Sequence, residues 1–214
     1  MEKPRYIAIE GPIGAGKTTL CRKLAEDLGG KPVLEEAEEN PFLVSFYKDR
    51  AKYGLKTQIL FLITRYLQQK ELAQHELFQQ TVVCDYLFSK DRIFAAMNLS
   101  KEEFFLYEKI YTLFDTQLPK PDLVVYLQAS LDVLKKHIKK RGIAFEKYIT
   151  DDYLSELTEG YNRYFFSYNE TPLLVVNVSD LDFVKNRQDY DNLVKEILTL
   201  RSKRGNKHYF SIGK

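Results

Sequence analysis

The first residues with a chemical signature follow a short apolar run near the amino terminus. Residues 11–18, Gly-Pro-Ile-Gly-Ala-Gly-Lys-Thr, match the pattern G-x-x-x-x-G-K-[ST] in full. In such a loop, backbone N–H groups and the start of a helix surround phosphate oxygens. Lys17 adds positive charge near the β- and γ-phosphates, and Thr18 offers a hydroxyl to Mg²⁺. The segment predicts a binding site for a nucleoside triphosphate with Mg²⁺, made by Gly11, Pro12, Ile13, Gly14, Ala15, Gly16, Lys17, Thr18 and Thr19.

The loop alone does not identify the molecule that accepts the phosphate. Kinases, GTPases, motors and transport ATPases all carry it, and a chain of 214 residues favours a small kinase. A GTPase would show a guanine-reading N-K-x-D motif. The only Asn-Lys pair, at residues 206–207, continues into His-Tyr, so that motif is missing.

Composition sets the class of protein. Hydrophobic residues make up 44% and charged residues 29% of the chain, as in ordinary globular proteins. A formal net charge of +2 is too small to indicate nucleic acid or a membrane surface as a partner. No apolar stretch approaches the roughly 20 residues of a membrane span, and the first residues show no signal-peptide pattern. Cys21 and Cys84 are too few for a disulfide framework, so we expect reduced thiols and a cytoplasmic protein.

The elements that must position the loop alternate along the chain. Short apolar runs predict strands at 6–10, 32–35, 81–84, 123–127 and 173–178. Helical periodicity and capping signals predict helices at 16–28, 41–49, 55–75, 88–97, from 100 to before Pro119, and at 130–141, 151–168 and 189–200. This pattern predicts an α/β fold with a central parallel sheet of five strands and helices on both faces. We expect one domain over residues 1–201 and a basic, mobile tail over 202–214.

The segments after the loop resemble the deoxynucleoside kinase family over nearly the whole chain, from residue 6 to about residue 200. Residues 34–42, Leu-Glu-Glu-Ala-Glu-Glu-Asn-Pro-Phe, correspond to a family segment that carries the catalytic glutamate. The resemblance implies that Glu35 is the general base toward the 5′-hydroxyl of the sugar. Glu36 and Ala37 stand where the family usually has Pro-Val. The neighbouring glutamates leave a shift by one position open.

A second match concerns the acceptor nucleoside. Tyr47, Gln58 and Arg65 have the family's spacings of eleven and seven residues. The resemblance implies that Tyr47 binds the 3′-hydroxyl and that Gln58 and Arg65 read the base. Residues seven apart share a helix face, and a buried glutamine needs hydrogen-bond partners that a base edge can supply.

The third match, residues 82–99, departs most from the family. Asp85 follows a predicted strand and matches the acidic residue of the family's D-R-S motif, which implies a role in Mg²⁺ binding. Tyr86 replaces the arginine, which normally helps to hold the base and the transferred phosphate. Lys90 or Arg92 could substitute for it, and this choice is open.

Two further residues of this segment bear on the base. Asp91, six residues after Asp85, corresponds to the residue that pairs with the base-reading arginine in members that prefer purines or cytosine. The resemblance therefore implies an Arg65–Asp91 pair and disfavours thymidine. Phe94 stands one position short of the family's stacking phenylalanine.

The fourth match, residues 135–150, resembles a helical lid over the donor phosphates. Arg141 corresponds to a phosphate clamp and Glu146 to a second ligand of the 3′-hydroxyl. A bidentate arginine would stabilise the charge of the moving phosphoryl group. The family's dimer interface falls on the helix that begins after Ser100, so the resemblance also implies a homodimer.

The sequence thus predicts a P-loop kinase of three layers that transfers the γ-phosphoryl of ATP to a deoxynucleoside, preferably a purine or deoxycytidine, for nucleotide salvage. Glu35, Lys17 and Arg141 are the predicted catalytic residues. A monophosphate kinase similar to thymidylate kinase and a nucleotide-binding module without catalysis are the alternatives. The preferred base, ATP against GTP as donor, feedback inhibition and the role of the tail are left open.

Overall fold

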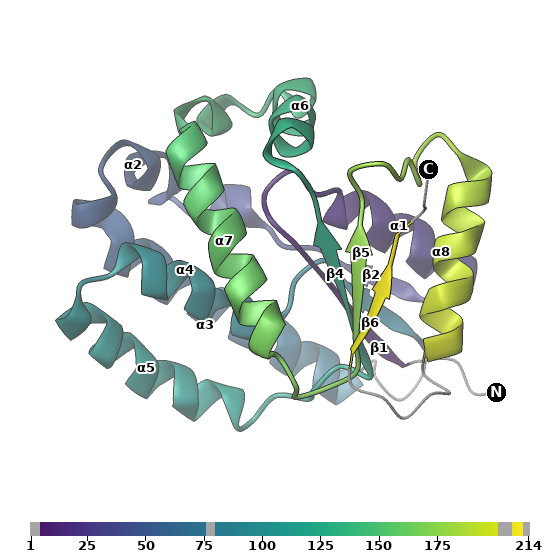
Figure 1. The fold of residues 1–214 in the computed structure, drawn as a ribbon. Helices are drawn as coiled ribbons and strands as arrows, with labels where there is room; N and C mark the ends of the chain where they lie inside the picture. The colour runs from purple at the N-terminus through teal and green to yellow at the C-terminus, as the bar shows by residue number, and fades with distance from the viewer. Residues whose placement is uncertain (1–4, 76–79, 201–206, 212–214) are drawn as a thin grey trace.

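The computed structural model describes residues 5–75, 80–200 and 207–211 (Figure 1). Six strands form one sheet in the order β2-β3-β1-β4-β5-β6, and every pair is parallel. The strands are β1 Tyr6–Glu10, β2 Lys31–Val33, β3 Val82–Cys84, β4 Leu123–Gln128, β5 Leu173–Asn177 and β6 Lys207–Phe210. Nearly every residue of the central strands is buried, as expected for a parallel sheet that is covered on both faces.

Eight α-helices and three 3₁₀ turns connect the strands in the described ranges. They are α1 Lys17–Leu28, η1 Ala37–Glu39, α2 Leu43–Lys48, α3 Arg50–His75, η2 Phe88–Lys90, α4 Asp91–Asn98, α5 Lys101–Asp115, α6 Leu131–Arg141, η3 Ala144–Tyr148, α7 Asp151–Ser167 and α8 Arg187–Leu200. A capping box between Ser100 and Glu103 starts α5, at the predicted position. Gly29 and Gly142, both left-handed, end α1 and α6 as predicted.

Alternate residues of the strands serve two separate hydrophobic layers. Ile7 and Ile9 pack with α1 and α8 on one face of the sheet, whereas Tyr6 and Ala8 face the layer that contains α7. Figure 1 shows α1 and α8 on one side of the strands, α2, α3, α4, α5 and α7 on the opposite side, and α6 at the top, beyond the ends of the strands. The predicted three-layer α/β fold is therefore confirmed.

The strand count differs from the prediction. Lys207–Phe210, which the sequence analysis assigned to the basic tail, forms β6 and pairs with β5 through Leu173↔Lys207 to Val176↔Phe210. Charged and polar neighbours hide this four-residue run in the sequence. An edge strand needs apolar side chains on one face only, and Phe210 packs partly buried against the core. The rest of the tail, apart from Ser211, lies outside the described residues.

Two helix starts differ most from the prediction. α3 begins at Arg50, five residues before the predicted start, and η2 replaces the first turn predicted for α4. No helix within the described ranges is long and apolar enough to cross a bilayer. Because β1 lies between β3 and β4, the strand order reverses beside it, which is where parallel α/β sheets bind ligands at their carboxyl ends.

Candidate active site

The glycine-rich loop between β1 and α1 is closely packed on two sides. Gly14 and Gly16 have φ angles of 88° and 96°, in the left-handed region. A Cβ atom at Gly14 would lie 2.7 Å from the carbonyl oxygen of Leu134, and one at Gly16 would lie 2.9 Å from the ring of Phe183. Only glycine fits these positions, and the bare backbone leaves room for a phosphate at the start of α1.

Lys17, the first residue of α1, folds back over the loop. Its Nζ donates hydrogen bonds to the carbonyl oxygens of Gly11, at 2.7 Å, and Pro12, at 3.2 Å. Burial lowers the pKa of Lys17, the negative charge of Glu10 opposes this, and the positive charge of Lys90 adds to it. The ammonium group is therefore already held at the loop, where phosphate oxygens could replace the carbonyl oxygens as its partners.

Thr18 and Asp85 meet although 67 positions separate them. Thr18 Oγ1 donates to Asp85 Oδ2 at 2.6 Å, and the other carboxylate oxygen accepts from the backbone N–H of Glu35 at 2.7 Å. Asp85 is buried directly after β3, so the strand end fixes its position. A hydroxyl and a carboxylate oxygen side by side suit Mg²⁺, which prefers oxygen ligands and takes the others from phosphate and water. The two residues fit the predicted metal site.

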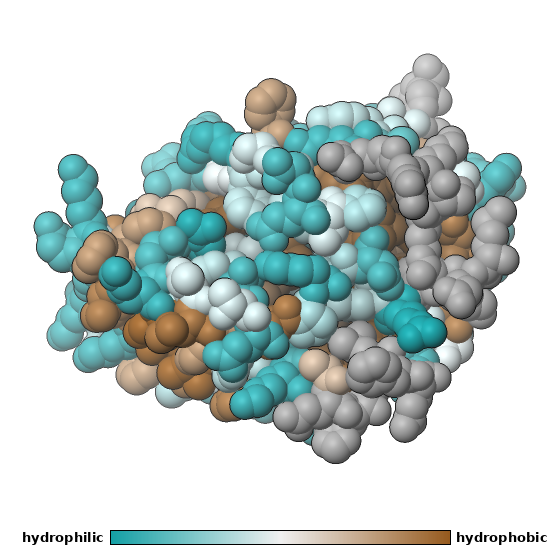
Figure 2. Space-filling model, turned by 90° about the horizontal axis from the view of Figure 1, so that it is seen from below, coloured by the Kyte–Doolittle hydropathy of each residue, from teal (hydrophilic) through white to brown (hydrophobic). Residues whose placement is uncertain are grey.

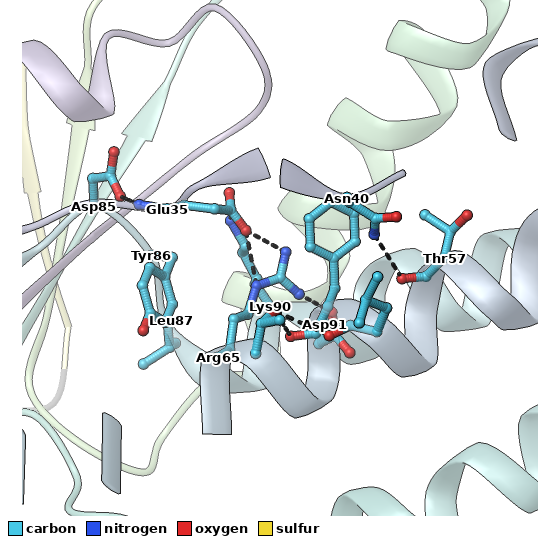
Figure 3. A network of polar contacts seen from close by, with 12 residues as sticks. Glu35, Asn40, Thr57, Arg65, Asp85, Tyr86, Leu87, Lys90 and Asp91 are labelled. Carbon is cyan, nitrogen blue, oxygen red and sulfur yellow. Dashed lines mark hydrogen bonds and ion pairs between the residues drawn. The ribbon is translucent and has the colours of Figure 1, made fainter. Parts of the chain in front are cut away.

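The carboxylate of Glu35 is held by two cations, one on each oxygen (Figure 3). Arg65, on α3, donates from Nε to Oε1 at 2.8 Å and also from Nη2. Lys90, at the end of η2, donates from Nζ to Oε2 at 2.7 Å. Burial would raise the pKa of Glu35, but the charges of Arg65 and Lys90 outweigh it and hold the pKa well below its usual range. Glu35 is therefore ionised at neutral pH, as a base must be.

Arg65 joins Glu35 to the predicted base-reading residues. Its Nη1 pairs with Asp91, which is fully buried and also accepts a hydrogen bond from the Tyr107 hydroxyl at 3.0 Å. Gln58 lies on the same helix, seven residues before Arg65. It is 2% exposed, and its Oε1 has no hydrogen-bond partner among the residues that the structure describes. An unpaired buried amide oxygen is costly, and the donor edge of a base would satisfy it.

Aromatic side chains surround the predicted sugar site. The ring of Tyr47 stacks on Phe145 at a centroid distance of 6.1 Å and meets Tyr153 edge to face at 5.9 Å. Burial raises the pKa of Tyr47, so its hydroxyl keeps its proton and can donate. Phe94 packs edge to face against Tyr161 of α7.

The predicted lid residues pair with each other. Arg141 Nε donates to Glu146 Oε2 at 3.2 Å, and its Nη2 contacts the other carboxylate oxygen. Burial raises the pKa of Glu146, and the charge of Arg141 opposes this shift. His137 of α6 also reaches the phosphate loop, since its Nδ1 lies 2.8 Å from the carbonyl oxygen of Gly14. The segment from α6 to η3 therefore lies beside the loop, where a lid would be.

The structure separates the two cations that could replace the missing arginine. Lys90 contacts Glu35, whereas Arg92 forms a surface ion pair with Glu108 at 2.8 Å. The sequence analysis missed Glu10, a buried carboxylate 3.5 Å from Lys90, although an acidic residue at the end of an apolar strand was a usable signal. It also missed the hydrogen bond from Tyr107 to Asp91, for which the sequence holds no signal. The roles of the predicted site residues stay predictions.

Comparisons with known proteins agree with this arrangement. A family model described as deoxynucleoside kinase matches residues 7–201. The chain is 38% identical to a deoxyguanosine kinase of Bacillus subtilis over 206 residues, which cover 92% of this chain and 100% of that one. It is 35% identical to a deoxyadenosine kinase of Lactobacillus acidophilus over 209 residues, 90% of this chain and 94% of the relative.

Solved structures show the same likeness. A deoxyadenosine kinase from M. mycoides with bound dCTP superposes with a TM-score of 0.76 at 28% identity, over 90% of this chain and 98% of that one. A structure of a deoxyadenosine kinase from the same organism with bound dATP gives a TM-score of 0.75 at 25% identity, over 89% and 98% of the two chains.

Proposed function

The chain belongs to the deoxynucleoside kinase family and is an ATP-dependent phosphotransferase, and from this premise we propose how its residues act and which nucleosides it accepts. The observation that carries the proposal is the position of the Glu35 carboxylate. The backbone N–H of Glu35 is hydrogen-bonded to Asp85 of the Thr18–Asp85 pair. The Glu35 carboxylate is bound by Arg65 of the Arg65–Asp91 pair, so Glu35 lies between the two pairs. Donor phosphate and acceptor nucleoside can therefore meet at this carboxylate.

In the proposed reaction Glu35 takes the proton of the 5′-hydroxyl. The 5′-oxygen forms the new bond to the γ-phosphorus, the bond to the bridging oxygen breaks, and ADP leaves with the electron pair. Lys17 and Arg141 stabilise the charge on the transferred group. Thr18 and Asp85 hold Mg²⁺, which supplies further neutralisation of the phosphate charge when it is bound.

The acceptor is a purine deoxynucleoside or deoxycytidine. Tyr47 and Glu146 hold the sugar, and Gln58 and Arg65 read the base, with Phe94 beside it. The buried Arg65–Asp91 pair supports this preference because it fixes the guanidinium donors in one orientation. The unpaired Oε1 of Gln58 needs a donor such as an exocyclic amine, which adenine and cytosine carry. The relatives of known structure hold dCTP and dATP, which also supports a deoxynucleotide site.

We also propose a cytoplasmic homodimer. Cys21 and Cys84 are buried free thiols, in keeping with a reducing compartment.

Large apolar side chains are exposed on α3 and α5, and Figure 2 shows brown residues gathered toward the end of the molecule where α5 lies. They are Ile63, Leu67, Phe105, Leu106 and Leu113. Such a patch marks an interaction surface. Leu113→Glu should give a monomer in light scattering, whereas Phe166→Glu, on exposed α7 surface, should not.

The first experiment is a transfer assay with ATP, Mg²⁺ and each of the four deoxynucleosides, beside the four monophosphates. Product from deoxyadenosine, deoxyguanosine or deoxycytidine, but little from thymidine, is the expected result. A strong preference for thymidine would overturn the proposed base selection. If only the monophosphates gave product, the acceptor would be a nucleoside monophosphate and the proposed acceptor would be wrong.

A further inference from the structure

Lys90 is a charged residue in a place where charge is costly. It lies in η2, 2% exposed, on the acceptor side of the site. A buried ammonium group is retained only when it is paired and hydrogen-bonded. Its Nζ has two anionic neighbours, Glu35 Oε2 at 2.7 Å and Glu10 Oε1 at 3.5 Å. Lys90 therefore bridges the end of β1 to the segment after β2.

Glu10 gives this bridge a rigid support. Its side chain is fully buried at the end of β1, directly before the phosphate loop. The carboxylate accepts from the backbone N–H of Gly11 at 2.8 Å and of Leu87 at 3.1 Å. These two bonds fix the carboxylate against the start of the loop and the residue before η2. Lys90 is thus paired with a carboxylate whose orientation is fixed by two backbone hydrogen bonds.

Tyr86 lies beside Lys90 and secures the neighbouring backbone. The Lys90 ammonium is 5.8 Å from the centre of the Tyr86 ring. The Tyr86 hydroxyl donates to Gln68 Oε1 at 2.6 Å, and Gln68 Nε2 donates to the carbonyl oxygen of Leu34 at 3.1 Å. The polar end of Tyr86 is therefore engaged with α3. Tyr86 thus supports, through Gln68, the backbone that precedes Glu35. The residue of this segment that contacts the Glu35 carboxylate is Lys90.

We propose that Lys90, anchored by Glu10, is a positioning residue for phosphoryl transfer, which fixes the Glu35 carboxylate toward the acceptor hydroxyl. The inference rests on the proposed role of Glu35 as the base. Arg65 alone would hold Oε1 and leave the carboxylate free to rotate about that contact. With Lys90 on Oε2, both oxygens are held from different elements, α3 and η2. A fixed base matters because misplacement by about 1 Å can cost about 10²-fold in rate.

The test compares Lys90→Met and Lys90→Arg with Arg92→Met as the matched control, since Arg92 is a cation of the same segment paired at the surface. We expect Lys90→Met to lower kcat by about 10²-fold, with KM for the deoxynucleoside and ATP affinity within about threefold of wild type. Lys90→Arg should restore kcat to within about tenfold, and Arg92→Met should leave it unchanged.

Other outcomes overturn the inference. One is a kcat within about threefold of wild type for Lys90→Met, which removes any role in the chemical step. Another is Lys90→Arg as slow as Lys90→Met, which would mean that the cation does not matter. If Lys90→Met does not bind a fluorescent ATP analogue and so is not folded, Lys90→Gln decides by the same threshold. A wild-type protein inactive on every deoxynucleoside counts instead against the proposed function, and the inference falls with it.

Discussion

On the donor side of the site, the contacts of the key cations are close in sequence, whereas on the acceptor side they are distant. Lys17 bonds to carbonyls five and six residues before it, and Arg141 pairs with Glu146 five residues after it. The contacts of Glu35 with Arg65 and Lys90 span 30 and 55 residues. The two donor-side cations are thus held within local segments, although Thr18 and Asp85 of the same side meet across 67 positions. The cluster around Glu35 joins several elements that meet only in the fold.

Burial separates the acceptor-side network from the arginine of the lid. The side chains of Lys90 and Asp91 are 2% and 0% exposed, whereas that of Arg141 is 44% exposed. A buried, fully paired network cannot rearrange without leaving charges unsatisfied. The Arg141 guanidinium is half exposed, although its partner Glu146 is buried, so water or phosphate can reach the arginine and replace this contact. The acceptor side is therefore organised before substrate binds, whereas the lid pair can exchange its partner for phosphate.

The strongest test of this contrast is Asp91→Ala, which removes one partner of the buried network. The Nη1 of Arg65 and the Tyr107 hydroxyl would lose their acceptor. We expect the free energy of unfolding to fall by about 3–5 kcal/mol, measured by urea denaturation. Arg92→Ala, which breaks a surface pair, should cost at most about 1 kcal/mol. Equal losses for the two variants would mean that burial does not set the acceptor side apart.

Glu35→Gln tests the acceptor side through the reaction itself. It keeps the shape and removes the proposed base, so kcat should fall by about 10²–10³-fold while ATP still binds. Glu36→Gln is the matched control, because Glu36 is exposed and the sequence alone could not exclude it. If Glu36→Gln were the inactive variant, the assignment of the base would be wrong by one position.

Arg141→Ala probes the donor side. We expect kcat to fall by about 10²-fold through lost charge stabilisation. The loss in the free energy of unfolding should be smaller than for Asp91→Ala, because the Arg141 side chain is 44% exposed and the buried Glu146, whose pKa burial already raises, can take up a proton. Lys140→Ala, the preceding exposed residue of α6, should retain wild-type kcat. A large loss of stability in Arg141→Ala would show that the lid pair is structural and would remove the contrast.

The smallest expected effect concerns pH. The folded state lowers the pKa of Glu35, so the ionised carboxylate contributes stability above its unfolded pKa of about 4.3, and this contribution is lost as pH falls below that value. Glu35→Gln should therefore lose about 2–4 °C less in Tm than wild type between pH 6 and pH 3. Glu36→Gln should follow the wild-type slope. Identical slopes for all three proteins would contradict the cation cluster around Glu35.

Signals that are local in sequence predicted much of the fold and named the residues of the proposed donor side. The apolar run of β1, the ends of α1 and α6 before Gly29 and Gly142, and the start of α5 after Ser100 each depend on neighbours within a few positions, so they can be read directly. The strand β6 was not predicted, because the sequence pattern of an edge strand is weak and the strand is stabilised by its pairing with β5. The start of α3 escaped because tertiary contacts extend a helix beyond its periodic residues.

The sequence by itself determined the phosphate loop and, through the resemblance, the positions of Glu35, Arg65 and Asp91. Only the tertiary structure decided that Lys90 contacts Glu35 while Arg92 faces Glu108 at the surface. Two residues apart, they point to different surroundings because η2 gives way to α4 between them. It also decided that Glu10 supports Lys90. Lys90 contacts Glu35 because the fold buries the carboxylates of Glu10 and Glu35 beside it. Strands β1 and β3, which pair across 76 positions, bring Glu10 next to the segment that carries Lys90.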